Sequence, residues 1–283
     1  MINIEDIVDR IALLEPVPPV ATQLLVLAED SDSSIAEIAD LLMHDPALTA
    51  NLLKICNSAY LGISRKIESI REAISFVGLD QIVDLVLLNS VSQNFQNRYD
   101  GYGLGEGELW RHAVSSAHVA KILADRHGAT QNKHLIFTAA LLKDIGKLVL
   151  GRYVAFSFEK INILVHSQGL SFNEAEKQII GMNHEELGAM VAEKWCFSDK
   201  MTYIIRNHHL SDTAARDNLE TAIVYLADII CMMMGVCTGA DGLAYRFYGD
   251  VLKQLNLSVN DLNGIIAEMG EHQSSIENLV NLI

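Results

Sequence analysis

The distribution of proline constrains the fold of this chain more than any other feature of its sequence. All four prolines, Pro16, Pro18, Pro19 and Pro46, lie near the amino terminus, and none follows. Proline breaks helix interiors, so long helices exclude it, whereas a β-rich protein of this size normally uses it in turns. Aromatic residues make up only 6% of the chain. The sequence therefore predicts an all-α protein.

Capping signals mark the starts of several expected helices. Ser34 and Glu37 form a capping box ahead of an apolar stripe, and the same pattern recurs at Ser171. Asp45 followed by Pro46 is typical of an N-cap with proline at the first helical position. The expected helices span residues 4–14, 20–28, 35–42, 46–56, 69–78, 80–91, 109–127, 132–150, 153–168, 171–180, 184–195, 199–208, 217–234, 242–255 and 258–268.

Glycine concentrates in one segment of the chain. Residues 98–107 read RYDGYGLGEG, with glycine at every second position from residue 101. Such a run is the best candidate for a boundary between helical units. We expect a smaller helical subdomain over residues 1–100 and a larger helical bundle over residues 101–283, with the last helices in residues 231–283.

Composition excludes several classes of protein. The chain carries 36 acidic and 21 basic side chains, a formal net charge of −15, and 50% of its residues are hydrophobic. Disorder needs low hydrophobicity alongside high charge, so it is excluded. The negative balance argues against nucleic acid as a partner, because binding to phosphates depends on cationic side chains. Binding to an anionic membrane surface is disfavoured for the same reason.

Features that bear on the cellular compartment favour the cytoplasm. The four cysteines show no CxxC pairing, which is typical of reduced thiols. The amino-terminal MINIEDIVDRI is acidic and lacks the form of a signal peptide. The most apolar segment, residues 222–237, is interrupted by Asp228, so no membrane span is expected.

Two aspartates and four histidines are candidates for chemistry. Asp144 and Asp228 each lie inside an apolar stretch, where a carboxylate is costly unless it is paired or bound to a cation. The histidines that accompany them in chain order are His112, His184, His208 and His209. Imidazole and carboxylate together suit divalent first-row metals. This pattern predicts one polar centre inside a helical bundle.

Structural roles are the alternative for each of these residues. His208 and His209 also suit a solvated helix end, where an imidazolium complements the helix dipole. Asp228 also suits a buried pair with a lysine. The histidines for which we expect a structural role are His44, His118, His127, His134, His166 and His272. Spacing alone leaves these alternatives open.

The order of these residues resembles the HD superfamily of metal-dependent phosphohydrolases. Residues 141–147, LLKDIGK, look like that family's LLHDIGK. An independent match lies in residues 16–90, where CNSAYLG followed by ISRKIESIREAISFVGL is similar to the amino-terminal half of HDOD domains. HDOD domains are HD-related output domains of bacterial signal-transduction proteins. The resemblance covers about residues 10–230 and implies that the larger subdomain is an HD-like helical bundle.

The resemblance implies a degenerate form of the first metal site of the catalytic family. The corresponding positions here are His112, Lys143, Asp144 and Asp228. Lys143 stands where the family has histidine, and a protonated ammonium has three donors and no acceptor, so it cannot ligate a metal. We expect Lys143 instead to pair with Asp144, with Asp228, or with both, and so to replace the charge of the missing metal.

A second metal site is implied by the related HD-GYP phosphodiesterases. The positions that correspond to its ligands are Asp144, His184, His208 and His209. We expect these four side chains to converge on one point, with zinc, iron, nickel or manganese as the candidate divalent metal. The HHExxDGxGYP signature of that class is absent, because the chain reads HHLSDTAARDN, with Leu210 in place of the glutamate. Hydrolysis of cyclic dinucleotides is therefore not expected.

Three hypotheses about function follow. The first is a stand-alone, non-catalytic output module that binds a signalling protein or a small ligand in the groove between its helical halves, with no catalytic residue and no required cofactor. The second is a metal-dependent phosphohydrolase that acts on a nucleotide or phosphoester. The third is a purely structural histidine cluster. Lys143, the missing signature and the acidic charge favour the first.

Overall fold

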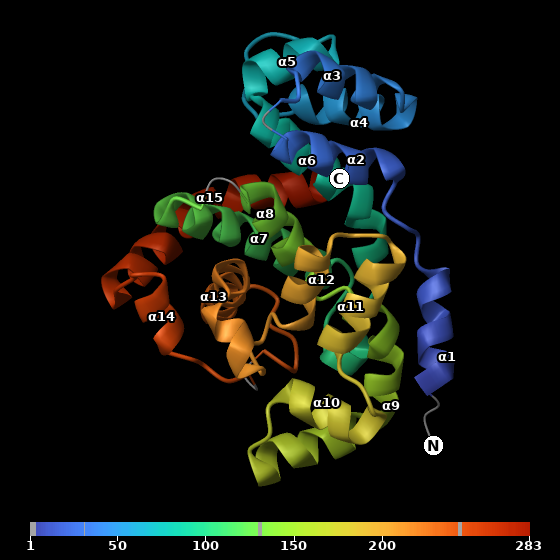
Figure 1. The fold of residues 1–283 in the computed structure, drawn as a ribbon, viewed down its shortest axis with the longest axis vertical. Helices are drawn as coiled ribbons and strands as arrows, with labels where there is room; N and C mark the ends of the chain where they lie inside the picture. Colours follow the sequence, from blue (N-terminus) through green and yellow to red (C-terminus); the bar gives the residue numbers. More distant parts are fainter. Residues whose placement is uncertain (1–3, 31, 130–131, 243–244) are drawn as a thin grey trace.

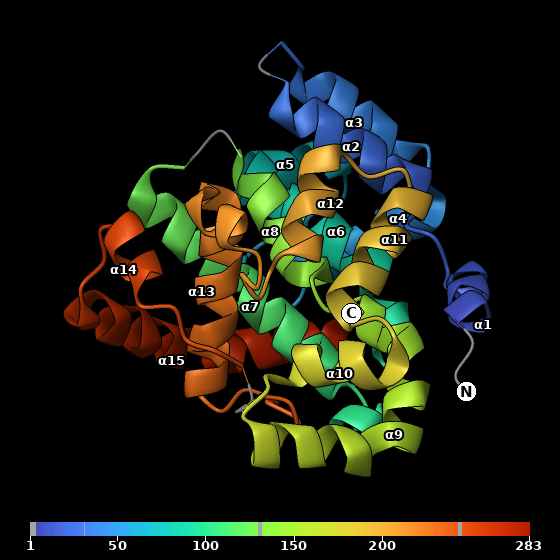
Figure 2. The ribbon, with the colours of Figure 1, turned by 60° about the horizontal axis from the view of Figure 1, so that its bottom comes forward.

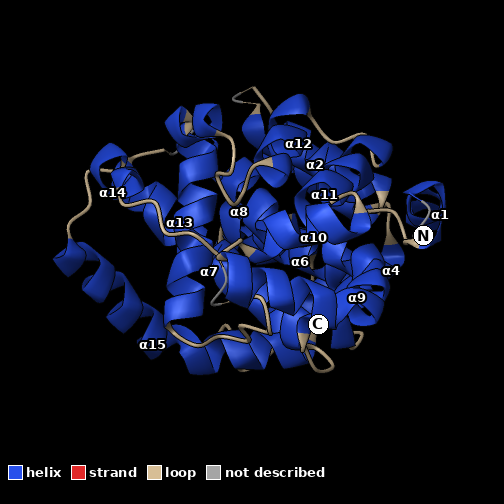
Figure 3. Cartoon of the chain, turned by 90° about the horizontal axis from the view of Figure 1, so that it is seen from below, coloured by secondary structure: helices blue, strands red, loops and turns tan. Residues whose placement is uncertain are grey.

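Helices provide the regular secondary structure of the chain, and the all-α prediction is confirmed. The computed structural model describes residues 4–30, 32–129, 132–242 and 245–283. No strand occurs within those ranges, as Figure 3 shows. One isolated antiparallel bridge joins Tyr99 and Leu104.

The helices carry the labels of Figure 1. The first group is α1 (Ile4–Asp9), α2 (Pro19–Glu29), α3 (Ile35–Met43), α4 (Pro46–Cys56), α5 (Ile70–Val77) and α6 (Leu79–Phe95). The second group is α7 (Glu108–His127), α8 (Lys133–Leu142), α9 (Gly146–Gln168), α10 (Phe172–Ile180), α11 (His184–Lys194), α12 (Asp199–Arg206), α13 (Leu219–Met233), α14 (Asp250–Gln254) and α15 (Val259–Leu282). Short 3₁₀ helices are η1 (Arg10–Leu13), η2 (Asp100–Tyr102) and η4 (Thr213–Asp217).

Several helices begin where the capping signals predict. The amide of Glu37 donates to Ser34 Oγ over 3.2 Å, and the amide of Ser34 donates to Glu37 Oε2 over 2.8 Å, which completes the capping box of α3. At the start of α4, Asp45 Oδ1 accepts from the amide of Leu48 over 3.0 Å. These bonds satisfy amides that a helix start leaves unpaired, so the local sequence determines these boundaries.

The connection between α8 and α9 differs from the prediction. Helices over residues 132–150 and 153–168 are expected from the sequence, but the chain turns at residues 143–145 and α9 then continues without a break. The turn lies there because it brings Lys143 and Asp144, which are both buried, toward α13. A continuous helix would carry these charges along an apolar face.

The carboxyl-terminal helices also differ from the prediction. The expected helix over residues 242–255 includes residues 243–244, which lie outside the described residues, and from residue 245 onward the helix is only the short α14. The described residues before α14 make side-chain hydrogen bonds instead, such as that from the hydroxyl of Tyr225 to the carbonyl oxygen of Arg246. The expected helix over residues 258–268 continues as α15 to Leu282. It continues because Met269, Ile276 and later apolar residues are buried along it.

The helices form two connected groups. Helices α2 to α5 gather at one end of the molecule, and α6 leads from them into the larger group, as Figures 1 and 2 show. Helix α6 contacts α2, α4 and α5 on one side and α7 and α8 on the other. Helix α7 packs against α8, α13 and α15 and so runs through the centre of the larger group.

The glycine-rich segment 98–107 is packed against the larger group. It contains η2, whose Tyr102 is fully buried, and η2 contacts α9. The Tyr102 carbonyl also accepts a hydrogen bond from the amide of Ala240 over 2.6 Å. The division of the chain into units at about residue 100 stays a prediction.

Helix α6 is apolar, yet it is short for a membrane span. Among the described helices no single one is both long and apolar enough to cross a membrane. Helices α5 and α6 meet the length and composition criterion only as a pair, which is bent by 118°. Apolar residues of α6 such as Ile82, Val83 and Leu85 are buried against the neighbouring helices.

Candidate functional site

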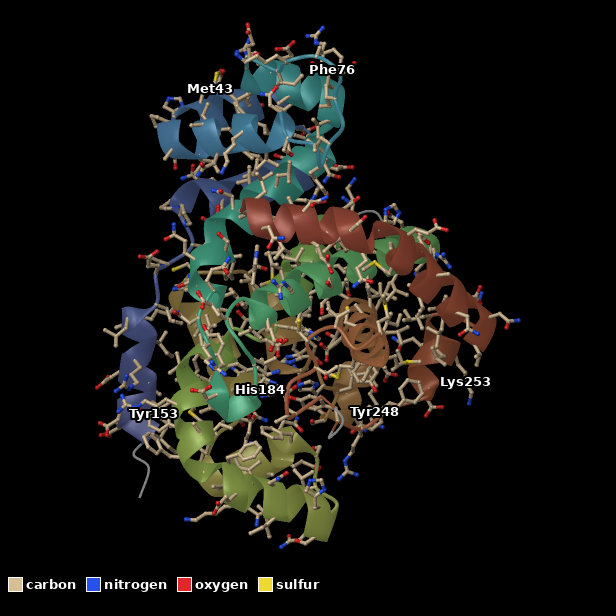
Figure 4. The ribbon with its side chains drawn as sticks, turned by 180° about the vertical axis from the view of Figure 1, so that it is seen from behind. Met43, Phe76, Tyr153, His184, Tyr248 and Lys253 are labelled. Carbon is tan, nitrogen blue, oxygen red and sulfur yellow. The ribbon has the colours of Figure 1, made fainter. Side chains whose placement is uncertain are left out.

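Asp144 lies between two buried polar clusters. It occupies the turn between α8 and α9 and is 2% exposed. Gly146 begins α9 directly after this turn, and a Cβ atom there would lie 2.0 Å from the carbonyl oxygen of His184. Glycine thus permits α9 to approach α11 closely, which sets Asp144 beside His184. Figure 4 shows His184 in the interior of the larger group of helices.

The lysine cluster comprises His112, Lys143, Asp144 and Asp228. The ammonium of Lys143 forms an ion pair with Asp144 and lies 2.8 Å from Asp228 Oδ1. His112 Nε2 lies 2.8 Å from the same Asp228 oxygen and 4.0 Å from Asp144 Oδ2. All four side chains are buried. The predicted pairing of Lys143 with Asp144, with Asp228 or with both is confirmed, since the ammonium contacts both carboxylates, and Asp228 thus pairs with a lysine.

Mutual attraction keeps this cluster charged. Burial alone would lower the pKa of Lys143, but Asp144 and Asp228 raise it above its ordinary value. Burial alone would raise the pKa of Asp228, yet Lys143 and the hydrogen bond from His112 hold it well below its usual range. The other ring nitrogen of His112, Nδ1, lies 2.9 Å from the carbonyl oxygen of Val236. Both ring nitrogens of His112 therefore face oxygen acceptors.

Lys147 is a second buried cation, which the sequence analysis missed. Its Nζ lies 2.8 Å from Asp144 Oδ1 and 2.7 Å from Asp241 Oδ2. Burial would lower the pKa of Lys147, but the two carboxylates raise it. One signal was available, because Lys147 follows Asp144 by three residues within an apolar stretch. Asp241 lies in a loop where no periodicity indicates its position.

The histidine cluster comprises His184, His208 and His209. His184 begins α11, and the other two follow α12. His184 Nε2 lies 3.0 Å from His209 Nε2, and one ligand nitrogen from each ring lies within 4.8 Å of the others. Asp144 Oδ1 lies 4.0 Å from His184 Nε2 and 3.9 Å from His208 Nε2. The three imidazoles lie together with Asp144 beside them, whereas the potential ligand atom of Asp144 groups with those of His112 and Asp228, so the convergence of all four on one metal stays a prediction.

The alternative prediction, that His208 and His209 lie at a solvated helix end, is wrong. A solvated helix end would expose them, whereas His208 is 0% and His209 5% exposed. Glu185 holds the chain after α12 in this inward position, because its Oε1 accepts the amide hydrogen of His209 over 3.0 Å. The role of these residues as metal ligands stays a prediction.

Hydrogen bonds hold two of the imidazoles from behind. His184 Nδ1 lies 2.7 Å from Glu176 Oε2, and the hydroxyl of Tyr102 donates to Glu176 Oε1 over 2.6 Å. His208 Nδ1 lies 2.7 Å from the carbonyl oxygen of Ile205. Because a carbonyl oxygen only accepts, His208 carries its proton on Nδ1 and presents a lone pair on Nε2. This arrangement is the usual outer support of metal-ligating histidines.

Two ring nitrogens of the cluster lack a hydrogen-bond partner within the described ranges. They are His208 Nε2 and His209 Nδ1. Burial lowers the pKa of His208 to about 3 and that of His209 well below its ordinary value. For His184, burial would lower the pKa, but Glu176 raises it. His208 and His209 are therefore neutral at physiological pH, which is the form that binds metals.

The two clusters differ in their fit to a metal ion. In the lysine cluster the ligand atoms of His112, Asp144 and Asp228 also lie within 4.8 Å of one another, but the ammonium of Lys143 takes the position between the two carboxylates that a metal ion would need. In the histidine cluster three converging imidazoles fit a divalent ion such as zinc. Asp144 would be a weaker fourth ligand, because Lys143 and Lys147 already pair with its two oxygens.

Other histidines have structural partners, as expected. His134 Nε2 lies 3.3 Å from Asp80 Oδ1, and its Nδ1 lies 3.7 Å from Asp84 Oδ1. Lys121 pairs with the same Asp84. These contacts join α6 to α7 and α8. His118 Nδ1 bonds a carbonyl oxygen of its own helix.

Known proteins resemble this chain over most of its length. A family model of the HDOD domain matches residues 14–211. An uncharacterised protein of Treponema pallidum (strain Nichols) is 26% identical over 206 residues, which cover 72% of this chain and 39% of that relative. The chain therefore spans well under half the length of that relative.

Solved structures share the fold at identities below 25%. An HDOD domain protein of unknown function from Geobacter sulfurreducens is 24% identical, with a TM-score of 0.73 and 99% of both chains covered. A Marinobacter aquaeolei VT8 protein, whose name proposes signal transduction, is 22% identical and has a TM-score of 0.77. The match covers 100% of this chain and 61% of that chain. A Shewanella amazonensis SB2B protein, whose name proposes a phosphohydrolase, is 20% identical, with a TM-score of 0.68 and coverage of 98% and 97%. Because the family model matches most of its residues, this chain belongs to the HDOD domain family.

Proposed function

We propose that this chain is a non-catalytic output module of bacterial signal transduction. The observation that carries the proposal is the position of Lys143, whose ammonium lies between Asp144 and Asp228. The HD resemblance implies a metal at this position in catalytic relatives. An ammonium supplies positive charge, but it cannot coordinate a substrate oxygen or a water molecule. It therefore provides neither Lewis acidity nor an activated water. The lysine cluster therefore keeps the helices together without supporting hydrolysis.

The balance of charge around Lys143 supports this proposal. Three buried carboxylates belong to Asp144, Asp228 and Asp241. They meet the ammoniums of Lys143 and Lys147 and the ring of His112, which lies between two oxygen acceptors. Each of these carboxylates thus pairs with a lysine ammonium of the same chain, which offsets the cost of its burial.

Binding, rather than chemistry, would then carry the signal. The proposed partner is a signalling protein or a small ligand. A cavity of about 640 Å³ lies where η1, the end of α6 and α9 meet. Its lining includes Leu13 and Phe156, which are 75% and 79% exposed, and it supports a protein contact at that place. The charge of −15 supports a module whose partner is neither nucleic acid nor an anionic membrane.

A metal-dependent phosphohydrolase is the second candidate function. The observation that favours it is the buried Nε2 atom of His208, which has no partner in the described parts of the chain. His184, His208 and His209 would hold the divalent metal, which could be zinc, iron, nickel or manganese. When bound, such a metal supplies Lewis acidity and an activated water. Glu176 would orient His184 through its hydrogen bond.

Hydrolysis assays separate the two candidates. The full chain, supplied in turn with Mn²⁺, Fe²⁺ and Ni²⁺, should turn over neither cyclic dinucleotides nor bis(p-nitrophenyl) phosphate above the rate of its Asp144→Ala variant. That variant is the matched control because it removes the carboxylate that both clusters share. Metal-dependent turnover that disappears in Asp144→Ala would contradict the non-catalytic proposal and establish the phosphohydrolase.

A further inference from the structure

One stretch of the chain is basic, although the chain as a whole is strongly acidic. Residues 46–67 contain Lys54, Arg65 and Lys66 and neither aspartate nor glutamate, whereas the formal net charge of the chain is −15. The stretch comprises α4 and most of the loop that leads to α5. At physiological ionic strength, charges more than about 8 Å apart are largely screened, so a binding partner at this place meets the local charge first.

The basic side chains of this stretch surround a groove. The groove has a volume of about 610 Å³, and its lining includes Lys54, Arg65 and Lys66, which are all exposed. Leu53 and Ile63 belong to the same lining and are half-buried. Apolar side chains of a partner would remove these two residues from water. We refer to this place as the basic groove.

Positive charge exceeds negative charge around the basic groove. Glu68 is the acidic residue of its lining, against three basic residues. Arg65 forms an ion pair with Glu72 of α5. In the parts of the chain that the structure describes, neither Lys54 nor Lys66 forms an ion pair. The two lysines are therefore available to carboxylates from outside the chain.

Hydrogen bonds hold the loop of the basic groove in place. The side-chain amide of Asn57 donates to the carbonyl oxygens of Leu53 and Ile67, each over 2.8 Å. Its Oδ1 accepts from the amide of Ile67 over 2.8 Å, so Asn57 joins the end of α4 to the far end of the loop. The guanidinium of Arg65 lies over the ring of Phe76, with its Cζ 4.1 Å from the ring centroid. A surface that is ordered before binding loses less conformational entropy when a partner binds.

The basic groove lies away from the lysine and histidine clusters. Phe76, which contacts Arg65, is 53% exposed. Figure 4 shows Phe76 at the end of the molecule where α2 to α5 gather, and His184 inside the larger group. Adjacent basic and apolar side chains suit a short acidic segment that also carries apolar residues. Duplex nucleic acid and anionic membranes are extended and meet a wider face of the molecule, where the net charge of −15 repels them.

We propose that the basic groove binds an acidic segment of a partner protein, in which acidic residues alternate with apolar residues. Carboxylates of the partner pair with Lys54 and Lys66, and its apolar side chains contact Leu53 and Ile63. This inference deepens the proposed function, on which it rests, by stating the chemistry of the protein partner. The basic groove is separate from the cavity between η1 and α9.

Fluorescence anisotropy with the full chain tests this proposal. The probe is a short fluorescein-labelled peptide of alternating glutamate and leucine. Lys54→Gln combined with Lys66→Gln should raise Kd about tenfold or more, because both charge pairs with the peptide are lost. Lys160→Gln combined with Lys194→Gln is the matched control, since both lysines are exposed and the net charge changes equally. The control should bind the peptide as wild type does.

A second peptide separates charge from apolar contact. With glutamine in place of glutamate, the peptide should bind wild type about tenfold more weakly or worse. Equal Kd values for the two double variants would overturn the proposal, as would no binding of the acidic peptide to wild type at about 1 mM.

Two other anionic probes test the choice of partner. Phosphatidylserine vesicles and duplex DNA should bind the wild-type chain no better than they bind the Lys54→Gln, Lys66→Gln variant. Binding of either probe that depends on these lysines, with peptide binding that does not, would contradict an acidic protein segment as the occupant. The hydrolysis assay tests the proposed function separately, since peptide binding requires no turnover.

Discussion

The lysine cluster and the histidine cluster share Asp144, yet they satisfy their buried polar groups differently. In the lysine cluster, Lys143 contacts Asp144 and Asp228 directly, and the side-chain nitrogen and oxygen atoms are paired. In the histidine cluster, His208 Nε2 and His209 Nδ1 are buried without a partner in the described structure. One cluster is complete within the chain, and the other has capacity for a ligand.

This difference separates stability from binding. A buried ion pair is costly to break from one side, because the remaining charge stays buried alone. A neutral imidazole without a partner costs less and remains able to bind a metal or accept a proton. Substitutions in the lysine cluster should therefore change the stability of the protein strongly, and added ligands should change it little. In the histidine cluster, added ligands should have the larger effect on stability and substitutions the smaller one.

The largest expected effect is that of Lys143→Met. The substitution preserves most of the side-chain volume but leaves Asp144 and Asp228 without the ammonium between them. The free energy of unfolding should fall by about 3–5 kcal/mol, which is typical when one partner of a buried pair is removed. Urea denaturation at neutral pH measures the change.

A surface lysine provides the matched control. Lys133 pairs with Asp80, and both side chains are partly exposed. Lys133→Met should cost at most about 1 kcal/mol. If Lys143→Met costs no more than this control, the ammonium does not stabilise the lysine cluster.

Added Co²⁺ should distinguish the histidine cluster. A metal that binds only the folded state stabilises it by about 2.7 kcal/mol when the free metal exceeds Kd a hundredfold. We expect Co²⁺ to raise the melting temperature of the metal-free protein and to give a visible absorption spectrum. His208→Ala should lose both effects, and His118→Ala, which changes a structural histidine, should keep them. The same response in both variants would place the metal elsewhere.

The smallest expected effect concerns the support behind His184. Tyr102→Phe removes the hydroxyl that donates to Glu176, while Glu176 keeps the bonds from His184. Stability should fall by about 1.5 kcal/mol, the low end for a hydrogen bond to a charged group. Tyr153→Phe removes a partly buried hydroxyl that accepts from Arg10 and is the control. If Tyr102→Phe lowers the free energy of unfolding as much as Lys143→Met does, the stability of both clusters depends on charge to the same extent.

The sequence predicts those parts of the fold and site that local patterns determine. Capping residues such as Ser34 and Asp45 locate helix starts because each cap bonds amides three residues away. The pairing of Lys143 with Asp144, Asp228 or both was expected from the family resemblance, because Lys143 stands where the family has a metal-ligating histidine. A shared polar centre was expected from the buried aspartates and the histidines, but the set that contains His184 and His209 came from the family resemblance, since distant helices bring them together.

Contacts that depend on loops could not be predicted. Asp241 reaches Lys147 only because Gly239 turns the chain against Tyr102, and no local sequence pattern predicts this contact. Tyr245 likewise has no sequence signal that relates it to His209. The break at residues 143–145 was missed because the apolar run continues through it, whereas tertiary charge pairing determines the turn.

Anomalous diffraction from crystals of the full chain grown with Co²⁺ tests most directly whether Lys143 has replaced a metal. At the cobalt absorption edge, we expect a peak among His184, His208 and His209 and no peak between Asp144 and Asp228, where the ammonium lies. A cobalt peak between these two carboxylates, with the side chain of Lys143 displaced, would contradict the replacement of metal by lysine.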